Sequence, residues 1–365
     1  MAQGYGSYDP RVWFIREAGY GGGEGTDPAS PTALTAGSTH VPFNNVDGGV
    51  GLKVPSPEVE LKKIIGNIYP HVLSGGMAPQ TMSVTTLYHA PFILSEIFSD
   101  VTIGAWGAGT ATIDMTALTA DWSAAQDSIA IHFHNEDAAG VNNVDWDFYG
   151  GVLTSYSWEI SDANGPSANI MESFDVSYSF AQENVVVMNP APTFHNNGFA
   201  YWNTDILDAS RGQTIEVPAS DCTFTADAGF NAGVNWQRVN FTIETPRAQE
   251  LTNGTGHATQ TWRDGLNISV EVEGILKSAT LYAEAVKSWY DRPVADCSLS
   301  WTKGSTTETL TCTKMFIDDM KEITASPDDD IPSKITCVFK PTSDSALTFA
   351  GVYDDVNTPD PSAYF

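Results

Sequence analysis

Basic residues are scarce in this chain. Its 365 residues include 17 Lys and Arg against 45 Asp and Glu, which gives a formal net charge of −28 at pH 7. No Lys or Arg occurs between Lys63 and Arg211. Tight direct binding to nucleic acid requires cations that neutralise phosphates, so we do not expect it as the function of this protein.

The carboxylates are interleaved with apolar residues and are not collected in one acidic segment. At about 0.1 M salt the Debye length is about 10 Å and at about 1 M it is about 3 Å, so concentrated salt suppresses repulsion across such a surface. The pattern is therefore typical of a folded protein adapted to high salt. A disordered acidic tail is the alternative, and the interleaving argues against it.

Long apolar runs are also missing. No stretch approaches the roughly 20 apolar residues that a membrane-spanning helix requires. The first residues, MAQGYGSYDPRVWFIREAG, lack a basic segment followed by an apolar one, so we expect no export signal. We expect the protein to stay in the cytoplasm where it is made until something releases it.

Cysteine is rare, and its spacing does not suit zinc. The four cysteines have no C-x-x-C spacing and no paired histidines near them: Cys222, Cys297, Cys312 and Cys337. If Gly304 and Ser305 form the turn of a hairpin, Cys297 and Cys312 lie opposite each other on its apolar face. We favour buried thiols there, and a cross-strand disulfide is the alternative.

Motifs of catalysis are absent: the chain has no G-x-S-x-G, no P-loop and no G-x-G-x-x-G after a predicted strand. The glycines from Gly21 to Gly25 lack a following Lys-Ser/Thr, so they predict no nucleotide site. His132, His134 and Glu136 share one face of a predicted strand, a spacing that could hold a metal. Solvated histidines are the interpretation that we favour.

Acidic clusters offer the remaining candidates. Asp145 with Asp147, and the run Asp328–Asp330, could provide calcium ligands, but neither has the glycine and final glutamate of an EF-hand loop. We favour solvated acidic loops. A carboxylate pair for glycoside hydrolysis can be drawn by chance from so many acids. We therefore assign no catalytic, cofactor or metal site and do not expect an enzyme.

Two stretches alternate with the period of a β-strand on both sides of a turn or loop. In the first, residues 150–180, a glycine pair opens an alternating run, a Gly/Pro/Asn/Asp cluster follows, and a second alternating run returns. In the second, residues 236–244 and 267–275 alternate around an expected polar loop. Two long hairpins of one design predict an antiparallel β-sandwich or barrel.

Other elements are less regular. We predict strands at 128–133, 222–226, 295–301, 307–317 and 333–341, a proline-started helix at 91–98, a helix at 277–289, a strand or helix at 60–67, and a surface loop at 189–218. The division that follows is an N-terminal arm and loop (1–80), a β-domain (81–350) and an extended C-terminal tail (351–365).

The two hairpin stretches, GGVLTSYSWEISDANGPSANIMESFDVSYSF and VNWQRVNFTIETPRAQELTNGTGHATQTWRDGLNISVEVEG, resemble those of tail tube proteins (major tail proteins) of long-tailed viruses. Residues 86–94, TLYHAPFIL, resemble the short helix that precedes the sandwich in such proteins. The resemblance covers roughly residues 80–350 and rests on patterns of β-structure. Residues 26–57 and 189–218 match nothing in it.

The resemblance implies a structural virion protein of the siphovirus tail. Its subunits would form hexameric rings that stack into a hollow tube, through which viral DNA passes. Partners would be further copies of the chain, a tape measure protein, and tail terminator and baseplate proteins, with no membrane and no cofactor. With the acidity, it suggests a virus of a halophilic archaeon. Aromatic residues of both ends are the expected ring contacts: Trp13, Phe14, Tyr20, Tyr353, Tyr364 and Phe365.

Two other functions stay open at this point. The surplus of Trp, Tyr and acidic residues also suits a β-sandwich that binds or hydrolyses glycans, either extracellular in a halophile or carried on a virion. A capsid decoration protein is the third possibility.

Overall fold

The computed structural model describes residues 11–23, 25–26, 31–33, 41–43, 52–55, 57–62, 71–77, 79–87, 102–103, 110–114, 128–136, 143–161, 170–183, 221–226, 234–245, 247–251, 258–263, 265, 267–276, 294–303, 306–324, 334–342 and 344–352. The extended elements in these ranges form one sheet of 16 strands and two separate pairs of strands. All named pairings are antiparallel, which confirms the mainly β antiparallel class.

The path through the large sheet contains β2 (Val41–Phe43), β1 (Arg11–Arg16), β8 (Ile129–Glu136), β9 (Asn143–Ser161), β13 (Val234–Glu244), β16 (Asn267–Leu276), β19 (Lys334–Lys340), β18 (Thr306–Thr324), β20 (Leu347–Val352), β7 (Thr110–Asp114) and β6 (Thr102–Ile103). Five strands branch from it: β5 (Gln80–Leu87), β10 (Met171–Tyr178), β11 (Phe180–Glu183), β12 (Cys222–Thr225) and β17 (Val294–Lys303).

The first predicted hairpin is confirmed as β9 and β10. Ser157 lies opposite Ser173, and β10 alternates between half-exposed and buried side chains along its whole length. The strand starts earlier than predicted, because β9 runs through the glycine pair. Gly150 has a φ of 67°, and a Cβ on Gly151 would lie 2.6 Å from the Ile129 carbonyl oxygen. The glycines therefore allow a change of direction inside one long strand.

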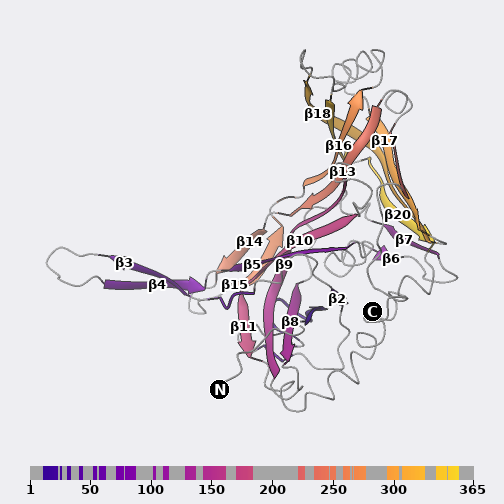
Figure 1. Cartoon of the computed structure of the whole chain (residues 1–365). Helices are drawn as coiled ribbons and strands as arrows, with labels where there is room; N and C mark the ends of the chain where they lie inside the picture. The colour runs from indigo at the N-terminus through magenta and orange to yellow at the C-terminus, as the bar shows by residue number, and fades with distance from the viewer. Residues whose placement is uncertain are drawn as a thin grey trace, which may run out of the picture.

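That change lets β9 belong to two groups of strands. Its residues before Gly150 pair with β8 and β11, and those from Val152 onward pair with β10 on one side and β13 on the other. The first group, with β1 and β2, lies below the second in Figure 1.

The second predicted hairpin is confirmed as β13 and β16, which pair from Val234 to Glu244. The prediction of a polar loop between these two strands is wrong. Within it, β14 (Arg247–Leu251) and β15 (Ala258–Arg263) form a two-stranded ribbon of their own. Their sequences RAQEL and ATQTWR carry few apolar residues, so the ribbon leaves no alternating apolar signal.

The three closing strands are confirmed, with β18 longer than predicted. Like β9, it serves two groups: residues up to Phe316 pair with β17 and β20, and Phe316–Thr324 pair with β19. The change coincides with Lys314, whose φ of 53° is left-handed, and with interrupted register on both sides. Irregularities of this kind bend a strand and increase its twist.

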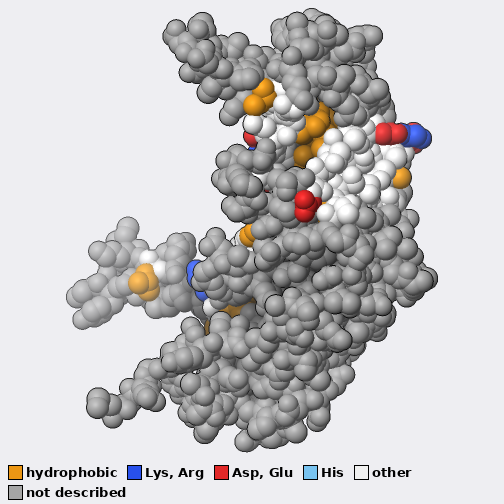
Figure 2. All heavy atoms as spheres, turned by 45° about the vertical axis from the view of Figure 1, so that its right-hand side comes forward, with side chains coloured by type: hydrophobic (Ala, Val, Ile, Leu, Met, Phe, Trp, Pro, Cys, Tyr) orange, Lys and Arg blue, Asp and Glu red, His pale blue; other side chains and the backbone are white. Residues whose placement is uncertain are grey.

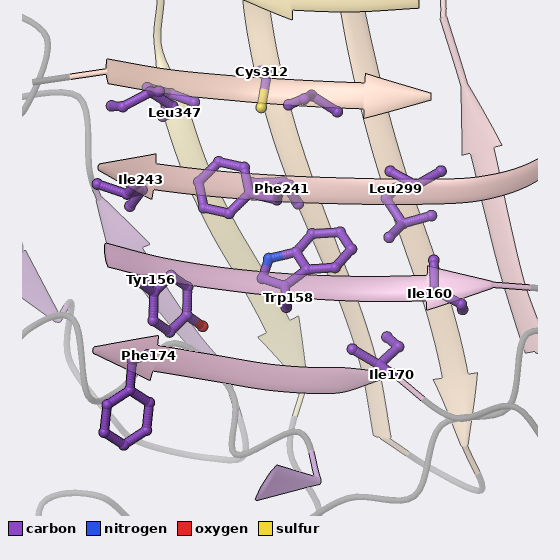
Figure 3. Packing of buried hydrophobic residues seen from close by; sticks show 14 of the residues in the cluster. Tyr156, Trp158, Ile160, Ile170, Phe174, Phe241, Ile243, Leu299, Cys312 and Leu347 are labelled. Carbon is purple, nitrogen blue, oxygen red and sulfur yellow. The ribbon is translucent and has the colours of Figure 1, made fainter. Parts of the chain in front are cut away.

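The core lies between two layers of strands. The first layer contains β5, β10, β9, β13, β16, β19 and the second half of β18, and the second layer contains β12, β17, the first half of β18, β20, β7 and β6. Figure 3 shows side chains of β9, β10 and β13 facing strands of the second layer, which cross behind them. Trp158 of β9 is fully buried and contacts Phe241 of β13 and Trp301 of β17 at ring-centroid distances of 5.8 and 6.1 Å. Aromatic rings of this size dominate the apolar area buried in such a core.

Part of the predicted N-terminal arm belongs to the main sheet, because β1 pairs along its length with β8. The ambiguous stretch at 60–67 begins in a strand: β3 (Pro57–Lys62) pairs with β4 (His71–Met77), and this hairpin projects away from the other strands in Figure 1. The division into three regions remains a prediction. Both predicted helices, the loop at 189–218 and the tail beyond residue 352 lie outside the described residues.

Candidate functional site

A continuous polar surface covers the outward side of five adjacent strands, and we call it the polar face. Its members are at least partly exposed: Thr81, Ser83 and Thr85 of β5, Ser173, Asp175 and Ser177 of β10, Ser155, Ser157 and Glu159 of β9, Arg238, Asn240, Thr242 and Glu244 of β13, and Asn267, Ser269, Glu271 and Glu273 of β16. Alternation places them opposite the core residues of the same strands.

The registers align hydroxyl side chains across all five strands of the polar face. One row runs through Thr85, Ser173, Ser157, Thr242 and Ser269, each directly opposite the next. The Ser173 hydroxyl donates to Thr85 Oγ1 at 3.2 Å. Figure 2 shows the molecule with the right-hand side of Figure 1 turned forward; much of the described surface in this view is white, the colour of backbone and of side chains that are neither hydrophobic nor charged.

The one cation of the polar face is Arg238, and carboxylates surround it. Its guanidinium donates to Glu159 at 2.6 Å, to Glu273 at 2.8 Å and to Glu271 at 3.4 Å. The hydrogen bond that Arg238 donates to Glu159, together with the charges of Glu159 and Glu273, raises the Arg238 pKa further above its usual range. With three acids on one guanidinium, this group of charges stays net negative and offers no free cation to a phosphate.

The group of strands that carries the polar face ends in two edges that no described strand covers. The order is β5-β10-β9-β13-β16-β19-β18; among the described strands β5 pairs with β10 alone, and β18 beyond Phe316 pairs with β19 alone. An uncovered edge presents a row of backbone donors and acceptors that can pair with another chain.

Backbone geometry identifies which residues of β5 present these donors. The Thr245 N–H donates to the Thr154 carbonyl at 2.9 Å. N–H groups alternate in direction along a strand, so counting through the registers from β13 to β5 directs the N–H groups of Thr81 and Ser83 away from β10. These two donors therefore lie on the outer side of β5.

The β3–β4 hairpin is the second surface that lacks cover in the described structure. It forms a sheet of its own, and Leu61 on it is 63% exposed. Val54, in the segment just before the hairpin, is 54% exposed. An isolated two-stranded hairpin is only marginally stable in water, so a partner that covers this apolar surface would stabilise it.

The interpretation of His132 as a solvated histidine is wrong. Its side chain is fully buried, and Nδ1 lies 2.6 Å from Oδ1 of Asp147, which is fully buried on the neighbouring strand. The Tyr149 hydroxyl donates to the second oxygen of Asp147 at 3.0 Å. Asp147 is therefore also not in a solvated loop, and both side chains serve a buried polar network.

A second buried carboxylate, Glu17, organises the glycine-rich segment. It accepts N–H groups from Gly21 at 2.9 Å, from Gly23 at 3.3 Å and from Gly150 at 3.1 Å. Gly23 has a φ of 63°, and a Cβ there would lie 2.3 Å from the Thr32 carbonyl oxygen. The glycines thus wrap backbone donors around one carboxylate beside the change of direction in β9.

Burial raises the pKa of the Glu17 carboxyl, although hydrogen bonds from Ser128 and the glycines oppose the shift. An acid whose pKa is higher in the folded state favours folding most below its unfolded pKa and loses that contribution as pH rises through the folded value. We expect Glu17→Gln to lower the free energy of unfolding. The variant should also make that free energy depend less on pH between the unfolded and the folded pKa of Glu17. Urea unfolding of both proteins across the window measures the difference, and parallel curves would contradict it.

The six predicted ring contacts are only partly described. Trp13 and Phe14 lie in β1, whose backbone pairs with β8 on one side and β2 on the other. The Tyr20 hydroxyl lies 3.1 Å from Ser179 Oγ within the same chain. Tyr353, Tyr364 and Phe365 fall outside the described residues, so their role stays a prediction.

No protein-family model matches the chain, and comparison with curated proteins finds no relative. The described residues contain no group of three or more His, Cys, Asp and Glu side chains placed to hold a metal. They also contain no helix long and apolar enough to cross a membrane. Among the described residues, the polar face belongs to a group of seven strands whose two outer members, β5 and the second half of β18, each have one edge that no described strand covers.

Proposed function

We propose that this protein is the subunit of a viral tail tube, a structural protein that assembles into stacked rings around a channel for DNA. The observation that carries the proposal is the pair of edges that no described strand covers, those of β5 and of the second half of β18, at opposite ends of one group of seven strands. Two different edges on one subunit suit a head-to-tail contact, which closes into a ring when the rotation between subunits allows it.

Ring closure would also protect the subunit. Edge strands without Lys or Pro are prone to uncontrolled pairing, and β5 reads QTMSVTTL. Pairing β5 of one copy with β18 of the next covers both edges, as closure does in a barrel. The strands of several subunits then form one continuous wall.

The polar face is the side of that wall that we assign to the channel. Its hydroxyl row hydrates well, and its carboxylates repel phosphate, while the carboxylates around Arg238 compensate the charge of this side chain. Binding to DNA relies on cations that displace counterions, so a surface without available cations lets DNA pass without holding it.

The direct test is assembly of the purified protein in molar salt. We expect rings or tubes with a central channel in negative-stain images, and a sedimenting species far larger than the 39.3 kDa chain. A protein that stays monomeric at high concentration in every condition would contradict the proposal. Binding to a glycan array by such a monomer would favour the glycan-binding alternative.

Salt concentration should control the assembly. Each chain carries a net charge of −28, so assembly brings many carboxylates of neighbouring subunits close together. The repulsion between these carboxylates grows as the Debye length increases from about 3 Å in 1 M salt to about 10 Å in 0.1 M. We expect dilution over this range to dissociate the tubes, measured by light scattering and sedimentation. Tubes indifferent to this dilution would show that the acidity has another role.

A further inference from the structure

Two cysteines face each other across a pair of neighbouring strands. Cys297 of β17 lies directly opposite Cys312 of β18, and Leu299 lies opposite Leu310 beside them. Directly opposed residues of antiparallel strands have Cα atoms about 4.5–5.5 Å apart. Disulfides require Cα separations of about 4.4–6.8 Å, so the register alone brings this pair within reach.

The side chains also point to the same side. Both thiols are buried, with 3% of Cys297 and 1% of Cys312 exposed. The other two cysteines lie on different strands in different registers: Cys222 is opposite Trp301, and Cys337 is opposite Val272 and Met320. One pair out of four cysteines therefore has the geometry for a bond.

We propose that Cys297 and Cys312 form a cross-strand disulfide when the chain folds or opens in the presence of a small-molecule disulfide such as oxidised glutathione. One protein thiolate attacks the small disulfide, forms a mixed disulfide and releases one small thiolate. The second protein thiolate then attacks the mixed disulfide at the protein sulfur and releases the other. The two protein thiols lose two protons and two electrons, and the small disulfide is reduced to two thiols.

The position of the bond gives it a structural consequence. Cys312 is the last residue of β18 that pairs with β20 and lies two residues before Lys314; the pairing with β17 continues to Phe316, where the pairing with β19 begins. A covalent link at this point would hold β17 against β18 beside the change of direction. The oxidised subunit would then resist separation of β17 from β18 more strongly than the reduced one.

Burial sets the timing of the reaction. The hydrogen bond to Cys297 and burial raise the pKa of Cys312, so few thiolates are present at neutral pH in the folded state. The oxidant also cannot reach sulfurs in a closed core. Oxidation should therefore be slow in the folded protein, faster at alkaline pH, and fastest when the strands have paired but the layers have not yet packed.

The experiment refolds the full chain in high salt with oxidised and reduced glutathione, then alkylates it under denaturing conditions. We expect an intact mass that shows two alkylated thiols and the loss of two hydrogen atoms. Peptide mapping should find residue 297 joined to residue 312. The oxidised protein should unfold at a higher denaturant concentration than the reduced protein.

Two variants serve as matched controls. Cys222→Ser with Cys337→Ala keeps the proposed pair and should still lose two hydrogen atoms, whereas Cys297→Ser should lose none. Peptide mapping of the natural sequence needs no variant, so the result stands even if one of them folds poorly. Four alkylated thiols at every glutathione ratio, or a bond that includes Cys222 or Cys337, would overturn the proposal.

Discussion

Proline in place of both Thr81 and Ser83 should abolish ring assembly and leave a folded subunit. The N–H groups of these residues lie on the side of β5 away from β10, so proline removes donors that the next subunit would use. The hydrogen bonds between β5 and β10 remain, and proline is tolerated in edge strands for this reason. Sedimentation and negative-stain microscopy in molar salt measure the loss.

The matched control replaces the same two residues by alanine. Thr81→Ala with Ser83→Ala removes the same hydroxyls from the polar face but retains both outward N–H groups, so this protein should assemble. A circular dichroism spectrum of β-type and a cooperative unfolding transition in the proline variant would show that its subunit still folds. Normal tubes from the proline variant would exclude β5 as the joining edge.

The hairpins could be predicted because their signal is local. Apolar and polar residues alternate from Ser155 to Glu159 and again from Phe174 to Phe180, and this alternation assigns each residue to one face of its strand. The Cys297–Cys312 register followed in the same way from a short turn. Alternation does not report how long a strand continues, so the full lengths of β9 and β18 were not predicted.

The buried polar groups could not be predicted, because their partners are distant in sequence or depend on an unknown register. Glu17 accepts N–H groups from Gly150, which lies 133 residues away. His132 and Asp147 lie opposite each other only in one register of β8 and β9, and no turn signal fixes that register. Polarity alone predicted exposure for both residues, and the pairing of one with the other made burial possible.

The strand lengths and the buried polar residues escaped prediction for the same physical reason. The sequence pattern places residues on a face, and the pairing of distant strands decides what that face meets. The polar face combines strands from residue 80 to residue 276, so no single stretch of sequence predicts that their hydroxyl side chains line up in one row. A polar residue in an alternating strand is thus best assessed after its neighbours across the sheet are known.

Truncation of Trp158 should destabilise the subunit more than any other change considered for the folded state. The side chain is fully buried and packs against Phe241 and Trp301, so it joins the two layers of the core. We expect Trp158→Ala to cost about 3–5 kcal/mol through lost apolar burial and the cavity left behind. Because a domain is stable by only about 5–15 kcal/mol, this change should bring the subunit close to unfolding.

Two neighbouring substitutions separate this packing role from general sensitivity of β9. Ser157→Ala changes the adjacent residue on the polar face and should alter the free energy of unfolding by less than about 0.5 kcal/mol. Trp158→Phe retains a ring, and the Trp158 indole N–H has no hydrogen-bond partner within the described structure. The loss of stability from Trp158→Phe should therefore lie between the losses from Ser157→Ala and Trp158→Ala. Denaturant unfolding in molar salt gives all three values. Equal losses for Ser157→Ala and Trp158→Ala would show that the strand, and not the joint between the layers, limits stability.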